Sequence, residues 1–215
     1  FAGAGTLVVT TTSDVSDGNI GSITTLLGNP GADGRISLRE AITATNNTPD
    51  GASPDRILFN IPEALVGGAH TIQPTAALPT INGALTIDAT SEPDFAGSPI
   101  VEIDGSLAGL ASGLSLTSLA DGTSIRGLVI NRFQGTAILI VSGADNVTIA
   151  GNYIGTDVSG TLDAGSTSNG INVNNVDSLT IGGSTAADRN IISGNDVRQI
   201  EINSGATNAT VTGNY

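Results

Sequence analysis

The sequence has no cysteine, methionine, tryptophan or lysine, and aromatic residues make up only 3% of it. The absence of cysteine excludes a disulfide framework, although it does not distinguish an exported protein from a cytosolic one. Hydrophobic residues still account for 39% of the chain. Its core therefore has to be built from isoleucine, leucine and valine.

Charge is also scarce, and most of it is negative. Charged residues make up 13% of the chain and the formal net charge is -13, which argues against a helical bundle rich in Glu and Lys and against a highly charged disordered chain. A surface of this sign repels a phosphate backbone, so nucleic acid is not an expected partner. No stretch approaches the roughly 20 consecutive apolar residues that cross a bilayer, so we expect no membrane span in this sequence.

What the sequence does contain is a repeat. The tripeptide Gly-Asn-Tyr occurs twice, and alignment on it gives four related segments: SIRG (124–127), TIAG (148–151), TIGG (180–183) and TVTG (210–213). One column of this alignment is aliphatic, one is Ser or Thr, and the last is glycine, which suits a corner where the backbone adopts positive φ. The residues after the glycines are Leu128, Asn152, Ser184 and Asn214. They predict a ladder of asparagines that is interrupted.

Two further sets of short strands accompany each segment. Pairs of aliphatic residues separated by one position precede it, as in Leu114 with Leu116 and Ile138 with Ile140, and this period of two marks a strand with one buried face. A third set follows the glycines, at 129–131, 153–155 and 191–193. Three short parallel strands per repeat, stacked about 4.8 Å apart, predict an all-β fold, a right-handed parallel β-helix.

The beginning of the chain follows a different pattern. We expect residues 1–69 to form an N-terminal cap with a leading strand and one short helix over about 37–45, and residues 70–215 to form β-helix coils that continue beyond residue 215. Ser37 and Glu40 form a capping box, and Leu38, Ala41 and Ile42 give one apolar stripe. Because exposed strand edges invite aggregation, this helix is expected to cover the end of the β-helix.

These segments carry a resemblance. ISLREAITATNN at 36–47 resembles the CSLREA element found near the N-terminus of many bacterial secreted β-helix proteins, with Ile36 in place of the cysteine. GNYIGTDVSGT, TIGG and RNIISGND are similar to the parallel β-helix repeats that follow that element. The resemblance implies a right-handed parallel β-helix in an extracellular or cell-surface protein. It implies no activity, because the same scaffold carries lyases, glycosidases, adhesins and structural proteins.

Enzymatic sites are hard to assemble from these residues. Pectate-lyase-like β-helices resemble one another in combining calcium-binding carboxylates with a Lys or Arg base. Without lysine, only Arg126, Arg132, Arg189 or Arg198 could be such a base, and we expect no carboxylate cluster around them. We therefore predict no catalytic residue.

Three carboxylates and the single histidine remain. Asp88, Glu102 and Asp104 could supply the two carboxyl groups that inverting hydrolysis needs at roughly 6.5–9.5 Å, although such residues at strand ends are more often solvated turn-formers. His70 stands alone, which excludes a catalytic triad or a multi-histidine metal site. We expect it at the surface or in a turn.

Calcium is the one cofactor that the sequence suggests. Asp14 with Asp17, and Asp157 with Asp163, lie in Gly-rich segments that could offer carboxylates and carbonyls to a hard cation. Neither segment matches an EF-hand, and Asp with Gly also simply forms turns. The turn interpretation is the favoured one, and no other cofactor is predicted.

The leading hypothesis is an exported, non-enzymatic module with a structural or adhesive role at the cell surface or in an extracellular assembly. Its expected partners are other protein subunits or cell-surface polysaccharide. The alternative hypothesis is a carbohydrate-active enzyme, either a polysaccharide lyase or a glycoside hydrolase, on the same scaffold.

Overall fold

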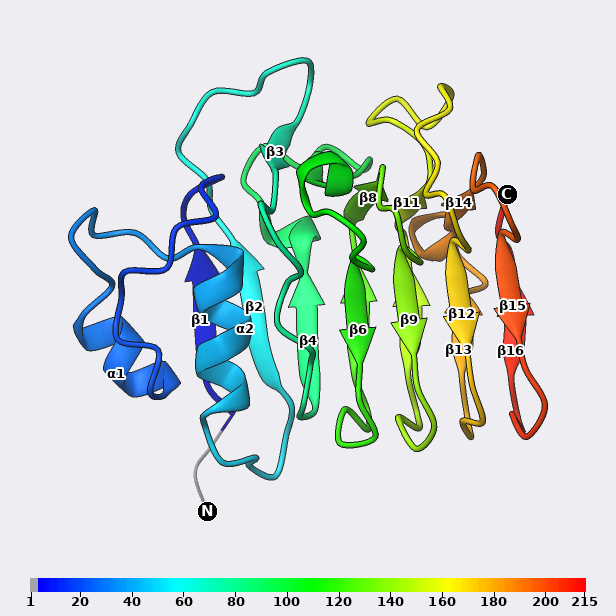
Figure 1. Cartoon of the computed structure of the whole chain (residues 1–215), viewed down its shortest axis with the longest axis horizontal. Helices are drawn as coiled ribbons and strands as arrows, with labels where there is room; N and C mark the ends of the chain where they lie inside the picture. The colour runs from blue at the N-terminus through cyan, green and yellow to red at the C-terminus, as the bar shows by residue number, and fades with distance from the viewer. Residues whose placement is uncertain (1–3) are drawn as a thin grey trace.

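The computed structural model describes residues 4–215, which form mostly short strands in three parallel sheets (Figure 1). Residues 1–3 of the expected N-terminal cap lie outside the described residues. The largest sheet has seven strands, in the order β1-β2-β4-β7-β10-β13-β16. These strands are β1 (Thr6–Val9), β2 (Asp55–Phe59), β4 (Leu85–Asp88), β7 (Ser124–Arg126), β10 (Thr148–Ala150), β13 (Thr180–Gly182) and β16 (Thr210–Thr212).

The other two sheets have five and four strands. The five-stranded sheet contains β3 (His70–Ile72), β5 (Val101–Asp104), β8 (Leu128–Asn131), β11 (Tyr153–Ile154) and β14 (Ile191–Ile192). The four-stranded sheet contains β6 (Leu114–Leu116), β9 (Ile138–Ile140), β12 (Ile171–Val173) and β15 (Ile200–Ile202). Short 3-10 helices follow β4, β5 and β13 at η1 (Ala89–Ser91), η2 (Gly105–Leu107) and η3 (Ala186–Asp188).

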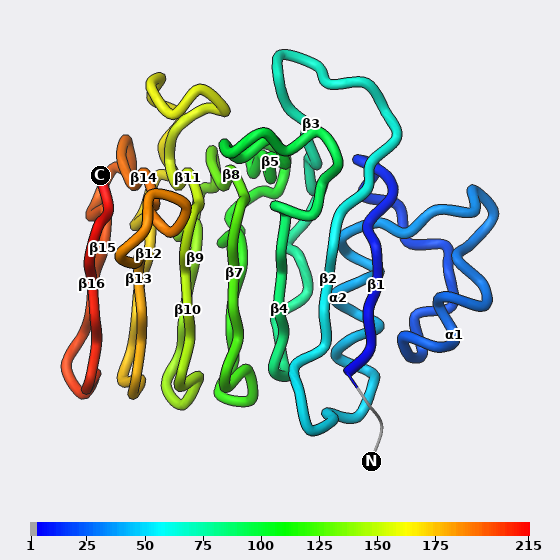
Figure 2. Tube along the Cα trace, turned by 180° about the vertical axis from the view of Figure 1, so that it is seen from behind, coloured from blue at the N-terminus to red at the C-terminus, as the bar shows by residue number. Residues whose placement is uncertain are grey.

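From β4 onward, successive strands belong in turn to the seven-stranded, the five-stranded and the four-stranded sheet. Each strand pairs in parallel with the strand three places further along, so that β4 pairs with β7, β5 with β8 and β6 with β9. We call one passage through the three sheets a circuit. Figures 1 and 2 show the circuits side by side along the long axis of the molecule.

The core consists of aliphatic columns, as the repeat predicts. In the seven-stranded sheet Ile125 is in register with Ile149, and Ile149 with Ile181. All three side chains are fully buried. Burial of one such side chain stabilises the fold by about 1.5–3 kcal/mol, and the column continues backward through Ile87 and Ile57. The Ser and Thr column beside it is also in register, from Ser124 through Thr210.

The corner glycines follow the prediction in three repeats out of four. Gly127, Gly151 and Gly213 have positive φ, and a Cβ on Gly151 would lie 2.6 Å from the carbonyl oxygen of Ala187. In the third repeat the positive φ belongs to Gly182 rather than to the predicted Gly183. Gly182 is the last residue of β13, where it pairs with Thr212 of β16, and it stands at the position that Ala150 occupies in the preceding circuit.

Two helices precede the circuits, α1 (Ile23–Gly28) and α2 (Leu38–Asn46). The expected helix is α2, with the predicted capping box: Glu40 donates its N–H to Ser37 Oγ, and its carboxylate accepts the N–H of Ser37. The first helix was not predicted, because the residue at its third position is Thr25 rather than Glu or Gln. Neither helix within residues 4–215 has the length and apolar character to cross a membrane.

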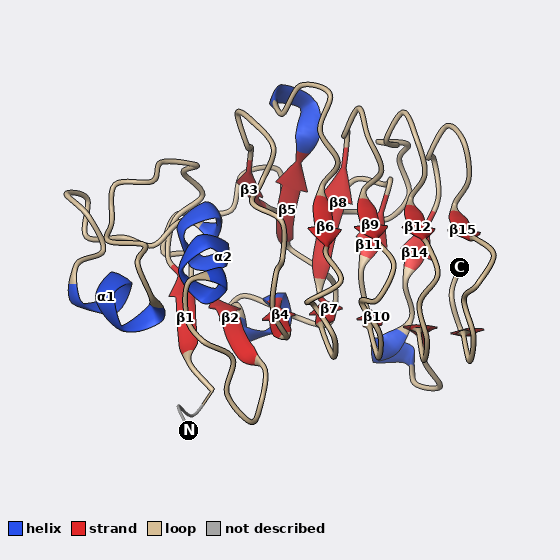
Figure 3. Cartoon of the chain, turned by 60° about the horizontal axis from the view of Figure 1, so that its bottom comes forward, coloured by secondary structure: helices blue, strands red, loops and turns tan. Residues whose placement is uncertain are grey.

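The position of α2 differs from the expected lid. Figures 1 and 3 show it flanking β1 and β2, in line with the strands of the four-stranded sheet, while α1 lies at the outer end of the molecule. The buried face of α2 includes Leu38, Ala41 and Ile42. It thus fills the place next to β1 and β2 that a strand fills in later circuits.

Candidate functional site

His70 lies in the core and not at the surface, so the expectation for this residue was wrong. It is the first residue of β3, where the side chains of His70 and Ile72 both point inward and are about 1% exposed. Its Nε2 lies 3.8 Å from Oε1 of the buried Glu92, and neither ring nitrogen has a hydrogen-bond partner within residues 4–215. The alternation of the strand places this imidazole where other circuits have an aliphatic side chain.

Arg132 does lie within a carboxylate cluster, contrary to the expectation. Its Nη1 is 3.2 Å from Glu102 Oε1, 3.5 Å from Asp104 Oδ2 and 3.3 Å from Asn131 Oδ1. No sequence pattern indicates this cluster, because it depends on the parallel register of β5 with β8, which sets Asp104 beside Asn131. Glu102 also accepts hydrogen bonds from Asn131 Nδ2 and from Thr71 Oγ1.

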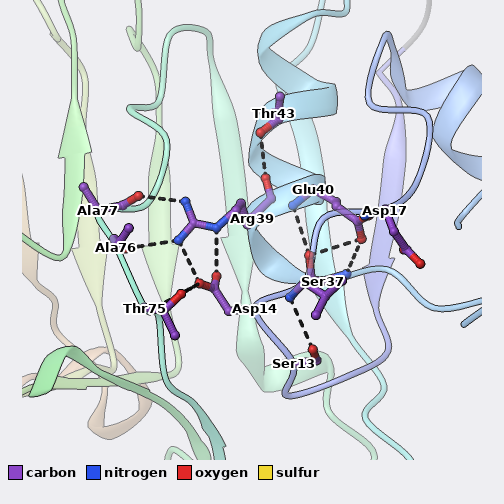
Figure 4. Close-up of polar contacts among 11 residues, drawn as sticks. Ser13, Asp14, Asp17, Ser37, Arg39, Glu40, Thr43, Thr75, Ala76 and Ala77 are labelled. Carbon is purple, nitrogen blue, oxygen red and sulfur yellow. Dashed lines mark hydrogen bonds and ion pairs between the residues drawn. The ribbon is translucent and has the colours of Figure 1, made fainter. Parts of the chain in front are cut away.

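The first pair of calcium candidates is held by side chains of α2 and by the backbone (Figure 4). The carboxylate of Asp14 forms two hydrogen bonds of 2.9 Å with Arg39 and accepts the N–H of Thr75 at 3.0 Å. Asp17 accepts the N–H of Ala32 at 2.9 Å and donates its own N–H to Glu40. A guanidinium thus occupies the position where the first carboxylate would meet a cation.

The second pair lies in the loop that follows β11. Asp157 accepts hydrogen bonds from Ser159 Oγ at 2.6 Å and from the N–H of Leu162. The bond from Ser159 makes the largest contribution to holding the pKa of Asp157 below its ordinary value, and the bond from Leu162 adds to it. Asp163 accepts the N–H of Gly165. Over residues 4–215 no group of three or more His, Asp or Glu side chains is arranged to hold a metal ion. Calcium binding stays a prediction.

A pocket of about 350 Å³ lies at the corner between the seven-stranded and five-stranded sheets. Its lining comes from five parts of the chain that are far apart in sequence: η1 with the loop after it, the corners of two circuits, the insertion that holds η3 together with β14, and Tyr215. The lining residues are Thr90, Phe95, Gly97, Pro99, Arg126, Gly151, Tyr153, Ala186, Ala187, Arg189, Ile191 and Tyr215.

The aromatic residues are distributed unevenly between this pocket and the core. Within residues 4–215, Phe59 and Phe133 are buried in the core. The other three aromatic side chains, Phe95, Tyr153 and Tyr215, all line the pocket. The sequence contains only two tyrosines, and both are here. In a chain so poor in aromatic residues, their convergence at one place singles out this surface.

Two arginines accompany the aromatic rings. The guanidinium of Arg189 lies 5.3 Å from the centroid of the Tyr215 ring, a cation–π arrangement, and its Nη1 donates a hydrogen bond to the Tyr215 hydroxyl. Arg126 Nε is buried and has no hydrogen-bond partner in the described part of the chain; it lies 3.9 Å from Asp88 Oδ1. None of the lining residues, all of them described, is acidic.

A ladder of asparagines fixes the backbone that carries these side chains. Asn152 Nδ2 donates to Asn190 Oδ1 at 3.1 Å, and Asn190 Nδ2 donates to Asn214 Oδ1 at 2.8 Å. Asn152 and Asn190 are completely buried. Each ladder residue is a chain neighbour of a residue that lines the pocket: Tyr153 follows Asn152, Arg189 precedes Asn190, and Tyr215 follows Asn214.

The ladder corrects the predicted column, which had Ser184 in its third place. The structure puts Asn190 there, because residues 184–189, with η3, project outward as an insertion before the strand resumes at β14. The ladder is therefore continuous from Asn152 to Asn214. The same insertion supplies Arg189 to the pocket, so the segment that breaks the sequence pattern also builds the site.

Sequence reasoning missed the pocket as a whole. From the sequence alone, Arg126 and Arg189 are candidates only for the base of a lyase, and Tyr153 is only part of a strand. The available signal was the repeated Gly-Asn-Tyr phrase, which puts Tyr153 and Tyr215 at the same corner position two circuits apart. Phe95 comes from an irregular loop that no repeat pattern predicts.

No protein-family model, no curated protein and no solved structure matches this chain. The function of the pocket has to be inferred from its geometry.

Proposed function

We propose that this chain is an exported, right-handed parallel β-helix that binds saccharide without cleaving it, as an adhesive or structural module at the cell surface or in an extracellular assembly. The rotation of the chain through three parallel sheets supports the β-helix. The ISLREA phrase across Ile36–Ala41, at the start of α2, supports the relation to CSLREA-type repeat proteins.

The convergence of Phe95, Tyr153 and Tyr215 on one pocket carries the proposal. Pyranose rings present an apolar face of C–H groups that packs against an aromatic ring, and a tyrosine adds a hydroxyl that can bind the polar edge of the sugar. The volume of about 350 Å³ lies at the lower end of the roughly 300–1,000 Å³ typical of ligand pockets. That size suits one or two sugar units of a longer chain.

The arrangement of the carboxylates favours binding over catalysis. Glycoside hydrolysis needs one carboxyl group that donates a proton and a second that acts as base or nucleophile. Glu102 and Asp104 share the cation of Arg132, and Asp88 accepts the hydroxyl and N–H of Thr90. None of these three carboxylates lines the pocket, so no pair of carboxyl groups flanks the glycosidic bond of a saccharide bound there.

Calorimetric titration with a panel of neutral and acidic oligosaccharides tests the proposal. We expect at least one member to bind the wild-type protein, and Tyr153→Ala to weaken that binding by about tenfold or more, since loss of one aromatic stacking surface removes more than 1 kcal/mol. Tyr215→Ala provides a second variant with little effect on folding, because this side chain is 72% exposed. Leu119→Ala, at an exposed site outside the pocket, is the control.

Two results would overturn the proposal. Binding by no saccharide in the panel, or binding unaffected by both tyrosine variants, removes the pocket as a saccharide site. Reducing-end analysis of the same mixtures addresses the alternative hypothesis. Cleavage of any member at an ordinary enzymatic rate would replace the binding module by a carbohydrate-active enzyme.

A further inference from the structure

The charge of the pocket is opposite to that of the chain. The sequence has 20 acidic residues and seven arginines. Two of the arginines, Arg126 and Arg189, line the pocket, and no acidic residue among the described ones does. A positively charged lining in a strongly anionic protein favours a ligand that carries negative charge.

Arg189 is the arginine most available to such a ligand. Most of the other arginines are paired with carboxylates: Arg35 with Glu63, Arg39 with Asp14, Arg132 with Glu102 and Arg198 with Glu201. Arg189 forms no ion pair within residues 4–215, and its guanidinium contacts the ring and the hydroxyl of Tyr215.

Arg126 is only partly neutralised. Its Nε approaches Asp88 Oδ1 no closer than 3.9 Å and makes no hydrogen bond to any described residue. Asp188 is also near Arg126, but its carboxylate accepts a hydrogen bond of 2.6 Å from the hydroxyl of Thr185. A guanidinium with unused donors binds a carboxylate through two parallel hydrogen bonds, which are stronger than those between neutral groups.

We propose that the pocket selects an acidic saccharide, in which the carboxylate of a uronic acid binds Arg189 with Arg126 reinforcing the charge, while neighbouring neutral sugar packs on Tyr153 and Tyr215. This inference rests on the proposed saccharide-binding function and adds the class of ligand.

The acid sugars of this ligand are spaced among neutral ones rather than contiguous. A net charge of -13 repels a dense polyanion over distances of about a Debye length, and Asp88 and Asp188 stand close to Arg126. A single carboxylate per pocket gains the contact with Arg189 and avoids most of this repulsion. The pocket's small volume, about 350 Å³, likewise has room for one acid sugar and part of a neighbour.

Three tetrasaccharides test this inference by calorimetry. Hyaluronan tetrasaccharide alternates glucuronic acid with a neutral sugar, its carboxyl-reduced form is neutral, and tetragalacturonate carries four adjacent acids. At low salt we expect hyaluronan tetrasaccharide to bind about tenfold more tightly than its reduced form, as one charge-assisted hydrogen-bonded pair provides, and more tightly than tetragalacturonate. The preference over the reduced form should shrink in 0.5 M NaCl.

Matched variants assign the preference to Arg189. Arg189→Gln should abolish the preference for the acidic ligand, measured as the ratio of the two Kd values. Any change in the position of Tyr215, which Arg189 contacts, acts on the acidic and the reduced tetrasaccharide alike and leaves that ratio unaffected. Arg56→Gln removes the same charge from an exposed position on β2 outside the pocket and should leave the preference intact. Thermal melts of both variants establish that they are folded.

The outcomes separate the two proposals. Equal binding of hyaluronan tetrasaccharide and its reduced form, both weakened by Tyr153→Ala, overturns the acidic ligand and leaves saccharide binding in place. An unchanged preference in Arg189→Gln overturns the role of Arg189, and tighter binding of tetragalacturonate overturns the spacing of the acids. Binding of none of the three, and of no member of the wider panel, overturns the saccharide-binding function itself.

Discussion

The N-terminal region, residues 4–59, and the later circuits, residues 114–215, satisfy buried backbone groups in different ways. In the N-terminal region a single carboxylate, that of Glu40, accepts the N–H groups of Asp17, Gly18 and Ser37 at 2.7–2.9 Å. Figure 4 shows Glu40 between Asp17 and Ser37. In the circuits, the side-chain amides of asparagines form the corresponding hydrogen bonds. Asn190 accepts the backbone N–H and the side-chain amide of Asn152, and its own side-chain amide donates to Asn214.

The difference follows from the spacing of the strands. A carboxylate can gather several donors at one place, but carboxylates stacked about 4.8 Å apart would repel one another. Asparagine carries both an acceptor and two donors, so it can pair with a copy of itself in the next circuit without charge. In the irregular region a single carboxylate therefore accepts several backbone N–H groups at one place. In the repeating region an uncharged asparagine, present in successive circuits, does the same.

Replacement of Glu40 gives the largest expected effect on stability. Glu40→Ala leaves the N–H groups of Asp17, Gly18 and Ser37 without their acceptor in a site where Glu40 is 1% exposed, so we expect a loss of about 3 kcal/mol or more, measured by urea unfolding. Glu40→Gln keeps the shape and one acceptor oxygen and should lose less. Equal stability of Glu40→Ala and wild type would contradict the role given to this carboxylate.

The ladder comes next in expected effect. Asn190→Ala removes the acceptor for Asn152 and the donor to Ile149 and Asn214, so we expect a loss of about 2 kcal/mol. Asn190→Asp places a carboxylate against the oxygens of Ile149 and Asn214 and should be at least as destabilised at pH 7. Its stability should recover relative to Asn190→Ala in acid, where the carboxyl group is protonated. Parallel behaviour of the two variants at all pH values would contradict the argument against charge in the ladder.

Replacement of Asp55 gives the smallest expected effect on stability, and it is a gain, whereas the Glu40 and Asn190 variants lose stability. Burial, with a smaller contribution from Asp50, raises the pKa of Asp55 although it accepts the N–H of Gly5 at 2.7 Å. Because the pKa is higher in the folded than in the unfolded state, its contribution to stability is fully present below the unfolded-state pKa and is lost as the pH rises through the folded-state pKa.

Asp55→Asn keeps an acceptor for Gly5 and removes the buried charge. We expect its Tm at pH 7 to exceed that of wild type by at most about 2–4 °C, and the gap to narrow as the pH falls. Asp50→Asn, which removes only the weaker repulsion, should give a smaller gain. A lower Tm for Asp55→Asn at pH 7 would show that the charge itself is needed there.

The parts of the fold that the sequence predicts are those that repeat. The columns through Ile125 and Ile138 follow from a period of two within each strand and from similarity between circuits, both visible in the sequence. The expectation for His70 followed the Gly-rich stretch before it, whereas Ile72, two residues further along the strand, indicates that both side chains lie on the buried face. The third ladder residue was misplaced because the alignment followed Gly183, and only the structure shows residues 184–189 looping out.

The pocket was not predictable because its residues share no local pattern. Phe95 and Arg189 lie in non-repeating segments, and Tyr153 and Tyr215 occupy a repeated position whose meaning depends on what surrounds it. What brings them together is the parallel register of the circuits. The residue types alone, scarce arginines and scarcer aromatics, were visible in the composition.

Tyrosine fluorescence tests the central claim most directly. The sequence has no tryptophan and two tyrosines, and both line the pocket, so the intrinsic emission of the chain reports on this one site. We predict a saturable change in emission on titration with hyaluronan tetrasaccharide, with the same Kd as calorimetry gives. Binding in the calorimeter with no change in tyrosine emission would place the saccharide elsewhere and contradict the account.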